Sequence, residues 1–409
     1  NIQAKEDAMK VMVIGGGGFY GRYLVADLLK FSEAKILVVS RNPPADLANH
    51  PRIQTVACDL HDRDRLCQLM RSCGLVIHCA GPFQYLPLTP LLVAIETRTD
   101  YLDLAEDRRF NQEVQALQPE IEAAGITVLT GLSVSPGFEM LFAEMGKHYF
   151  AELTGIRTYA APDTRKHRGP AMFATMLMGV GQPFWQPEGG EPRLVHGWTE
   201  PEWVEFPPPI GRRLTHLVLE MAHLDLLPDE MGVGTVAFKA GTEWTVLNRL
   251  LNLSARIRRR WGWPRWERLT ALVRALSWLM GRFGKDEGGV IFALTGRSHG
   301  RELTHRLAIN ARRDGGLIPA SLASIAASRL ISGNLQASGL VPLNNWLTTG
   351  ELLDELRGRG LEIWWQPDGA AAWERLPAGL PANPAEGLAN PTGWPTRRVG
   401  GPVRSAGVR

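Results

Sequence analysis

The stretch from Lys10 to Leu29 constrains the fold more than any other part of the chain. It reads KVMVIGGGGFYGRYLVADLL, so the apolar run Val11 to Ile14 leads into a glycine cluster and then into apolar residues at helical spacing. Within the cluster, Gly16, Gly18 and Gly21 satisfy the pattern G-x-G-x-x-G. A strand, a glycine turn and a helix in this order place backbone N–H groups against a pyrophosphate. The stretch therefore predicts a dinucleotide site.

Each of the three glycines has a separate predicted role. Gly16 makes the tight turn, Gly18 allows the backbone to approach a phosphate, and Gly21 allows the helix to pack closely. The alternative is an ordinary glycine-rich turn, because a chain with 43 glycines can match the pattern by chance. The strand before the motif and the helix after it favour the dinucleotide interpretation.

The end of the second predicted strand indicates which dinucleotide is bound. The run Ile36 to Val39 is followed by Ser40 and Arg41, where a cofactor with a free 2′-hydroxyl usually meets Asp or Glu. A hydroxyl beside a guanidinium instead suits a 2′-phosphate, to which a planar cation makes paired charge-assisted hydrogen bonds. The sequence thus favours NADP over NAD. The alternative is that Arg41 is a solvated loop charge before Pro43.

The third predicted strand, Ile53 to Ala57, leads to Asp59. The carboxylate of Asp59 could accept a hydrogen bond from the adenine amino group, or it could cap the helix expected near Asp62. The sequence leaves both interpretations open.

The fourth predicted strand, Leu75 to Cys79, continues into Ala80 and Gly81. Strand ends at one edge of a doubly wound sheet line the ligand crevice, so these two residues should pass beside the nicotinamide ribose. His78 lies inside the apolar run and is expected to be a core histidine rather than a catalyst.

The segment that begins at Asp100 offers the candidate catalytic residues. Tyr101 and Asp103 lie on the same side of a predicted short strand, Tyr101 being a candidate proton donor. The alternative is that both side chains brace the loop structurally. Helices are expected over 88–96 and 111–124, with a strand over 126–129, and the repeated alternation predicts a parallel sheet of about six strands.

Four motifs together resemble the NADP-binding domain of the saccharopine dehydrogenase-like oxidoreductases. They are GGGGFYG (Gly15 to Gly21), AGPFQ (Ala80 to Gln84), YLDLAED (Tyr101 to Asp107) and GLSVSPGF (Gly131 to Phe138). A looser likeness extends through DGGLIPAS, Asp314 to Ser321. Some members of this family act on lipids and often carry the segment Y-x-D-x-x-G-E. This chain has no glycine between Asp103 and Glu106, so the resemblance does not imply that it shares their substrate.

The resemblance implies an NAD(P)-dependent oxidoreductase with a Rossmann domain interrupted by a sheet-based second domain. It also implies that late helices return to the first domain. Carried over to this chain, the motifs imply a cofactor site with the following residues: Gly16, Gly18, Phe19, Tyr20 and Gly21 at the pyrophosphate, Ser40 and Arg41 at the adenosine end, and Ala80, Gly81 and Pro82 near the ribose.

From about Ser133 the α/β alternation stops and short apolar runs rich in aromatic residues follow. Strands are expected over 155–161, 194–196, 203–206, 233–239 and 290–298, which suggests a largely antiparallel sheet in a second α+β domain. Helices are expected over 138–149, 170–180, 322–330 and 345–357, with a short strand over 361–364.

The predicted organisation has four parts. Residues 1–8 form a disordered lead-in, 9–132 the dinucleotide-binding domain rejoined by helices in 318–366, 133–317 the substrate domain, and 367–409 a disordered tail.

The segment Trp244 to Phe283 is unusually basic and rich in tryptophan. It holds nine arginines and a single acidic residue, Glu267, and suggests two amphipathic helices broken near Pro264. Such helices suit an anionic membrane surface or a hydrophobic partner such as a second copy of the chain. The alternative is a surface hairpin of helices whose arginines are solvated.

Composition limits the remaining possibilities. A net charge of +3 does not favour nucleic acid, and the four cysteines form no C-x-x-C pair, so reduced thiols are expected rather than a zinc site or a disulfide frame. We see neither a signal peptide nor an apolar run of about 18 residues, and we expect a cytoplasmic protein, with the membrane contact peripheral.

These features favour an NADP-dependent oxidoreductase that acts on a small-molecule substrate, which the aromatic and basic second half suggests is apolar or lipid-like. The alternative is a non-catalytic NADP-binding redox sensor or membrane-associated scaffold. No metal-ligand spacing is present in the sequence.

Overall fold

The first layer of the molecule is a seven-stranded parallel sheet. The computed structural model describes residues 8–165, 177–261, 278 and 282–376. The strand order is β15-β6-β5-β4-β1-β2-β3. The strands are β1 (Lys10–Ile14), β2 (Lys35–Ser40), β3 (Ile53–Ala57), β4 (Leu75–His78), β5 (Asp100–Asp103), β6 (Thr127–Leu129) and β15 (Gly339–Leu340). Most of their side chains are buried, which is why the central strands read as continuous apolar runs.

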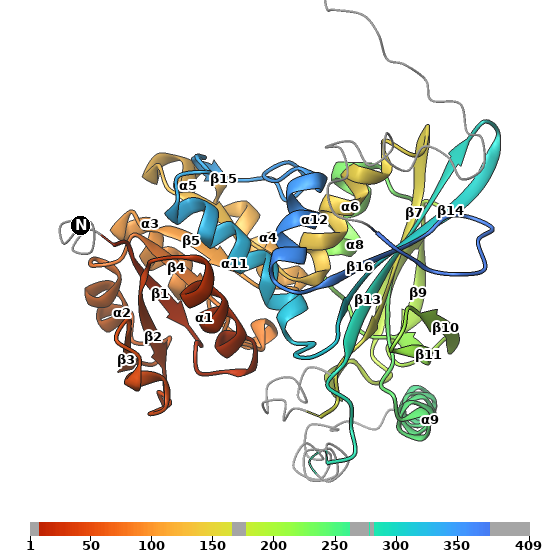
Figure 1. Ribbon diagram of the computed structural model, residues 1–409, viewed down its shortest axis with the longest axis horizontal. Helices are drawn as coiled ribbons and strands as arrows, with labels where there is room; N and C mark the ends of the chain where they lie inside the picture. The colour runs from red at the N-terminus through yellow and green to blue at the C-terminus, as the bar shows by residue number, and fades with distance from the viewer. Residues whose placement is uncertain (1–7, 166–176, 262–277, 279–281, 377–409) are drawn as a thin grey trace, which may run out of the picture.

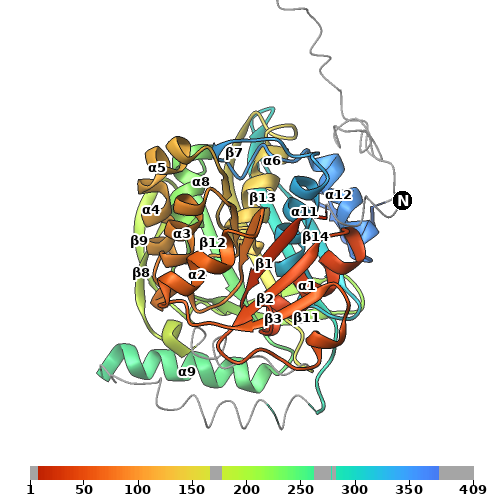
Figure 2. The same ribbon diagram turned by 90° about the vertical axis from the view of Figure 1, so that its left-hand side faces the viewer.

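Helices cover both faces of this sheet (Figure 2). On one face α1 (Phe19–Phe31) packs against α11 (Leu317–Ile331), and on the other α2 (Arg63–Met70) packs against α3 (Thr89–Thr97). The predicted Rossmann-type doubly wound α/β fold is confirmed. The seventh strand, β15, comes from late in the chain, and its two residues are too short to give a periodic signal.

The helix expected over 111–124 is instead two helices, α4 (Arg108–Ala116) and α5 (Gln118–Ala124). They meet at Leu117, whose ψ of 7° leaves the helical region, and a proline opens the second helix. Gly125 follows α5 in the left-handed conformation that a helix C-terminus favours.

The second layer is an eight-stranded mixed sheet in the order β10-β11-β12-β7-β13-β14-β16-β17. Its strands are β7 (Glu152–Ala161), β10 (Glu202–Phe206), β11 (Gly211–Leu217), β12 (Thr235–Ala240), β13 (Gly288–Ser298), β14 (Arg301–Ala311), β16 (Glu362–Gln366) and β17 (Glu374–Arg375). The pair β12–β7 is parallel and the other pairs are antiparallel. The prediction of a second α+β domain on a largely antiparallel sheet is confirmed.

The longer strands that were not expected from the sequence are β11, β14 and β8 (Pro183–Glu188). Strand β8 forms a separate hairpin with β9 (Glu191–His196). The first half of β14 is mostly polar and partly exposed, so it lacks the apolar alternation of a half-buried strand.

Helices α6 (Glu139–Gly146) and α8 (His223–Met231) fill the space between the two sheets (Figure 1). The same continuous core includes Leu24 of α1, Phe142 of α6 and Phe292 of β13. The two sheets are therefore joined through packed side chains rather than through a linker.

The late part of the chain contacts both layers. α11 lies on α1, and Gly339 and Leu340 pair with β6, whereas β16 joins the second sheet. With these contacts in support, we propose that residues 318–358 complete the dinucleotide-binding domain.

The disordered tail was expected to begin at residue 367, which is too early. Residues 367–376 are described, and Glu374–Arg375 pairs with Trp364 and Trp365 as β17. The predictions for the lead-in (1–7), the rest of the tail (377–409), most of the helix over 170–180, and the second basic helix with its break near Pro264 lie outside the described residues.

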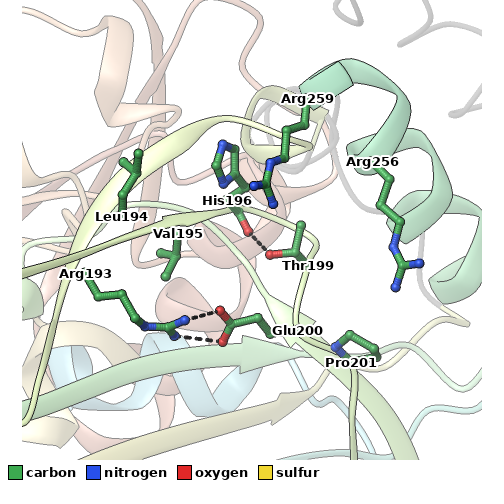
Figure 3. Close-up of a pocket in the computed structure, with 9 residues that line it drawn as sticks. All are labelled: Arg193, Leu194, Val195, His196, Thr199, Glu200, Pro201, Arg256 and Arg259. Atoms are coloured by element: carbon green, nitrogen blue, oxygen red, sulfur yellow. Dashed lines mark hydrogen bonds and ion pairs between the residues drawn. The ribbon is translucent and has the colours of Figure 1, made fainter. Parts of the chain in front are cut away.

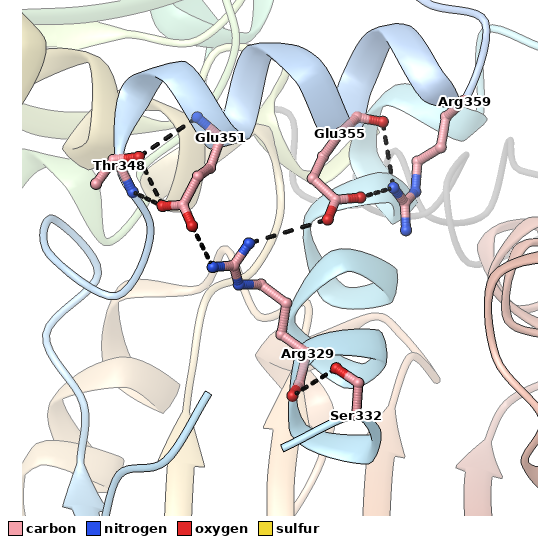
Figure 4. Close-up of polar contacts among 6 residues, drawn as sticks. All are labelled: Arg329, Ser332, Thr348, Glu351, Glu355 and Arg359. Carbon is pink, nitrogen blue, oxygen red and sulfur yellow. Dashed lines mark hydrogen bonds and ion pairs between the residues drawn. The ribbon is translucent and has the colours of Figure 1, made fainter. Parts of the chain in front are cut away.

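An arginine network holds α12 (Thr349–Gly358) against α1 and α11, and Figure 4 shows its part between α11 and α12. Arg359 donates from Nε to Asp27 Oδ2 at 2.7 Å and from Nη1 to Glu355 Oε2 at 2.5 Å, and its side chain is almost fully buried. Arg329 reaches Glu351 Oε1 at 2.5 Å and lies 3.9 Å from Glu355 Oε1. The pair Arg359–Asp27 joins segments that are far apart in sequence.

Replacing Arg359 by alanine should lower the free energy of unfolding by about 3–5 kcal/mol, because it leaves the buried carboxylate of Asp27 without its partner. Urea unfolding followed by circular dichroism measures the change. The matched control is Arg297→Ala, which removes an exposed ion pair with Glu152 and should cost less than about 1 kcal/mol. Equal effects of the two substitutions would contradict the role given to Arg359.

Candidate functional site

The glycine turn joins β1 to α1 at the carboxyl edge of the parallel sheet. Gly15 has a φ of 80°, and a Cβ built there would lie 2.6 Å from the backbone nitrogen of Ala80. Gly15 is therefore the left-handed position of the turn, since only glycine adopts this conformation without strain. Gly16 lies inside the same turn, which a hydrogen bond from the Gly18 N–H to the Gly15 carbonyl oxygen closes at 2.8 Å. A Cβ on Gly21 would overlap the carbonyl oxygen of Gly15, so Gly21 allows the close helix packing that the motif predicts.

Helix α1 begins without a capping side chain. Gly18 precedes the helix in an extended conformation, no side chain caps its amides, and the first turn carries no acidic residue. The positive end of the helix dipole is thus not neutralised by a carboxylate. A turn of this kind can hold a phosphate, which keeps Gly16, Gly18, Phe19, Tyr20 and Gly21 as the proposed pyrophosphate site.

Ser40 and Arg41 lie beside this turn at the end of β2. The hydroxyl of Ser40 is buried and has no hydrogen-bond partner among the described residues, and a Cβ on Gly17 would lie 3.7 Å from it. Arg41 is exposed, and its charge contributes to the lowered pKa of Asp59. An unpartnered hydroxyl and an exposed guanidinium at this position fit the 2′-phosphate of NADP.

Asp59 does not cap a helix. Asp62 is the N-cap of α2 and accepts a hydrogen bond from the Arg65 backbone at 3.0 Å. Asp59 instead accepts from the His61 backbone at 2.9 Å, and its Oδ1 also lies 2.9 Å from His61 Nδ1. These bonds to His61 are the main causes that lower the pKa of Asp59, so an ionised carboxylate is held close to Arg41.

The segment after β4 passes beside the glycine turn, because Ala80 lies directly against Gly15. A Cβ built on Gly81 would meet nothing within 4 Å. Gly81 thus borders open space, and Ala80 connects it to the proposed pyrophosphate site. This position agrees with a role near the nicotinamide ribose, which stays a prediction.

His78 and Tyr101 form a buried pair at the ends of β4 and β5. Both side chains are fully buried, and the Tyr101 hydroxyl lies 3.1 Å from His78 Nδ1. Burial lowers the pKa of His78 to about 3, and burial together with the charge of Asp103 raises the pKa of Tyr101 well above its usual value. The expectation of a core histidine is confirmed. For Tyr101, full burial favours bracing over proton donation.

Asp103 is also fully buried, and its carboxylate accepts hydrogen bonds from residues that follow β5 and β6. Its Oδ1 accepts hydrogen bonds from the backbone N–H of Ala105 at 2.9 Å and of Gly131 at 2.8 Å. The hydroxyl of Thr130 donates to both carboxylate oxygens, at 3.0 and 2.9 Å. Burial nevertheless raises the pKa of Asp103 to about 6. The geometry makes Asp103 a brace between β5 and β6, so neither candidate catalytic residue is open to a substrate.

Glu106 is a half-buried carboxylic acid close to Tyr101 and Asp103. It follows β5, and burial together with the charges of Asp107 and Asp103 raises its pKa to about 7. Its carbonyl oxygen accepts a hydrogen bond from the backbone of Ala222 at 2.9 Å, where the second layer meets the first. An acid that titrates near neutral pH can donate or accept a proton. In the sequence Glu106 lies within the YLDLAED motif, three residues after Asp103, but nothing there indicates its raised pKa.

A second buried cluster lies where the chain leaves β6 for α6. The Ser135 hydroxyl lies 2.5 Å from His223 Nδ1, and Glu139 Oε2 lies 3.0 Å from the same nitrogen. The Thr158 hydroxyl donates to Glu139 Oε1 at 2.5 Å. Because both Ser135 and Glu139 meet one nitrogen, the three groups do not form a Ser–His–acid relay, which uses both ring nitrogens. His223 could not be found from the sequence, since it lies 88 residues beyond Ser135.

We also searched the described part of the chain for metal-binding clusters and membrane-spanning helices. It contains no cluster of His, Cys, Asp and Glu that could hold a metal ion, and none of its helices is long and apolar enough to cross a membrane. The four cysteines are free thiols.

Comparison with known proteins identifies the first layer. Residues 11–129 match the family model of the saccharopine dehydrogenase NADP binding domain. These residues are a saccharopine dehydrogenase NADP binding domain. A probable mitochondrial saccharopine dehydrogenase-like oxidoreductase from Arabidopsis thaliana is 25% identical over 162 residues, which are 35% of this chain and 35% of the plant protein. The match therefore covers about a third of that relative's length.

Two solved structures share the fold over most of the chain. Saccharopine dehydrogenase (L-Glu forming) from Saccharomyces cerevisiae has a TM-score of 0.60 at 15% identity and covers 88% of this chain and all of its own. Homospermidine synthase from Legionella pneumophila, solved with NAD, has a TM-score of 0.59 at 9% identity and covers 86% of this chain and 89% of its own. The two-layer arrangement around the NADP binding domain is thus a known fold.

Proposed function

We propose that the protein is an NADP-dependent oxidoreductase that transfers a hydride between nicotinamide and a small-molecule substrate. The observation that carries the proposal is the uncapped glycine turn beside the unpartnered Ser40 hydroxyl and the exposed Arg41. The family of residues 11–129 supports a nicotinamide cofactor in general. The preference for NADP rests on Ser40 and Arg41.

The bound cofactor would supply the hydride chemistry. The chain would bind and orient the cofactor and the substrate, and it would supply a proton to the substrate. We assign proton transfer to Glu106, because the residue is half-buried at this edge and its pKa is raised to about 7. Tyr101 and Asp103 act as positioning residues that hold the ends of β5 and β6. We further propose an apolar or lipid-like substrate and a cytoplasmic protein that contacts a membrane peripherally or pairs with a second copy.

The direct test is to purify the protein, assay it for bound NADP(H), and follow NADPH absorbance with carbonyl, imine and enoyl substrates. Turnover with one of these classes is the expected result. Tight NADPH binding without turnover on any of them would favour a redox sensor or scaffold instead, and no dinucleotide binding would reject both functions.

The raised pKa of Glu106 predicts a pH-dependent stability. The folded protein holds this proton more tightly than the unfolded chain, so the wild type should lose stability as the pH rises from about 4.5 to about 7. Glu106→Gln cannot ionise and should not show this loss. Urea unfolding across this pH range measures the difference between the two proteins.

The control for this prediction is Glu120→Gln, which changes an exposed carboxylate of α5 in the same way. It should follow the wild-type pH profile. Parallel profiles for the wild type and Glu106→Gln would contradict the raised pKa.

In turnover assays, the rate of substrate reduction should fall above about pH 7 as Glu106 loses its proton.

A further inference from the structure

Helix α9 (Thr245–Trp261) presents a stripe of apolar side chains to solvent. Val246, Leu250, Leu253 and Trp261 are 70%, 53%, 53% and 75% exposed. Their spacing places them along one side of the helix. An ordinary surface helix turns such a stripe toward the core, so this stripe needs another explanation.

The opposite side of α9 fixes the helix to the second layer. Leu251 and Ala255 pack with Val180 and Trp198. The Asn252 amide donates to the carbonyl oxygen of Trp198 at 2.7 Å. Figures 1 and 2 both show α9 at the outer margin of the molecule. The stripe is therefore turned outward by specific contacts.

Arginines border the stripe along one edge. Helical spacing places Arg249, Arg256 and Arg260 on the same side of it, and all three are exposed. Within Thr245–Trp261 there is no acidic residue, and among the described residues these three arginines make no ion pair with a carboxylate. No carboxylate in the described part of the chain therefore neutralises the positive charge of this edge.

A pocket lies between α9 and the β8–β9 hairpin on the inner side of this edge (Figure 3). Arg256 and Arg259 line it together with His196. The Glu200 carboxylate in the same pocket is engaged by Arg193, with hydrogen bonds of 2.7 and 3.0 Å. The two helix arginines are thus left to attract an anion.

We propose that α9 docks the protein on an anionic lipid bilayer. The apolar stripe enters the boundary between headgroups and acyl chains, and the arginines meet lipid phosphates. A second copy of the chain fits this surface less well, because α9 offers no carboxylate to a facing arginine. The stripe is also one helix wide, whereas stable protein interfaces bury about 800 Å² per partner. This surface is separate from the proposed nucleotide site.

The test is co-sedimentation of the full-length protein with phosphatidylcholine vesicles, with and without phosphatidylglycerol. We expect binding to the anionic vesicles and weak binding to the neutral ones. The stripe variant replaces Val246, Leu250 and Leu253 by serine and should bind at least about tenfold more weakly. The edge variant replaces Arg249, Arg256 and Arg260 by glutamate and should bind about 100-fold more weakly.

The matched control replaces Arg65, Arg71 and Arg301, which are exposed on other elements, by glutamate and so changes the net charge equally. It should bind the vesicles far better than the edge variant. Circular dichroism and NADPH titration verify that each variant is folded. Equal loss in the edge and control variants, undiminished binding by the stripe variant, or absence of wild-type binding would overturn the proposal. So would a wild-type dimer in light scattering that the stripe variant loses.

Discussion

The variant Gly21→Val is expected to lose NADP(H) binding by at least about 100-fold. A side chain at this position overlaps the carbonyl oxygen of Gly15, which belongs to the backbone of the turn and cannot move aside as a side chain could. Helix α1 must then shift away from β1, and its N-terminus leaves the phosphate position. Titration of the protein with NADPH, followed by nucleotide fluorescence, measures the loss.

Two further variants separate lost binding from lost folding. Gly18→Ala places its Cβ 3.1 Å from the Gly15 oxygen, so the fold should persist while phosphate approach is hindered. Gly358→Ala is the matched control, because nothing lies within 4 Å of its Cβ in α12, and it should bind NADPH as the wild type does. Unchanged binding by both Gly21→Val and Gly18→Ala would mean that the turn does not hold the cofactor.

The second large effect concerns the choice between NADP and NAD. Arg41→Asp should weaken NADPH binding by roughly 30- to 100-fold, because the guanidinium is lost and a carboxylate faces the 2′-phosphate. NADH binding should change little or improve, since an acid at this position suits a free 2′-hydroxyl. Parallel titrations with both reduced nucleotides give the ratio directly.

Arg65→Asp is the control for Arg41→Asp, since it makes the same charge change at an exposed residue of α2. It should shift both nucleotide affinities by no more than a few fold through screened charge. If Arg41→Asp weakened NADPH and NADH equally, the interpretation of Arg41 as a solvated loop charge would be the correct one.

Local sequence was sufficient for much of the first layer. The glycine turn, β1 and α1 are adjacent in sequence, and their steric requirements appear directly in the residues from Gly15 to Gly21. Parallel strands buried on both faces also give strong apolar signals, as Val11 to Ile14 do. The motif matches this cluster only at Gly16, Gly18 and Gly21, so it gave no sign that Gly15, just before it, takes the left-handed conformation.

Features that depend on contacts between residues far apart in the chain could not be predicted from the sequence. Strand β15 has two residues and exists because Gly339 and Leu340 pair with β6. The burial of Tyr101 and Asp103, which favours bracing over catalysis, depends on partners such as Gly131 on the next strand. The contact between Ser135 and His223 likewise arises only when α8 packs between the two sheets.

The measurement that tests the central claim most directly is calorimetric titration of the wild-type protein with NADPH and with NADH. Saturable binding of one NADPH per chain, at least about tenfold tighter than NADH, is the predicted result. This preference follows from Ser40 and Arg41 at the end of β2. Saturable binding of neither nucleotide would contradict the proposed cofactor site and the oxidoreductase function built on it.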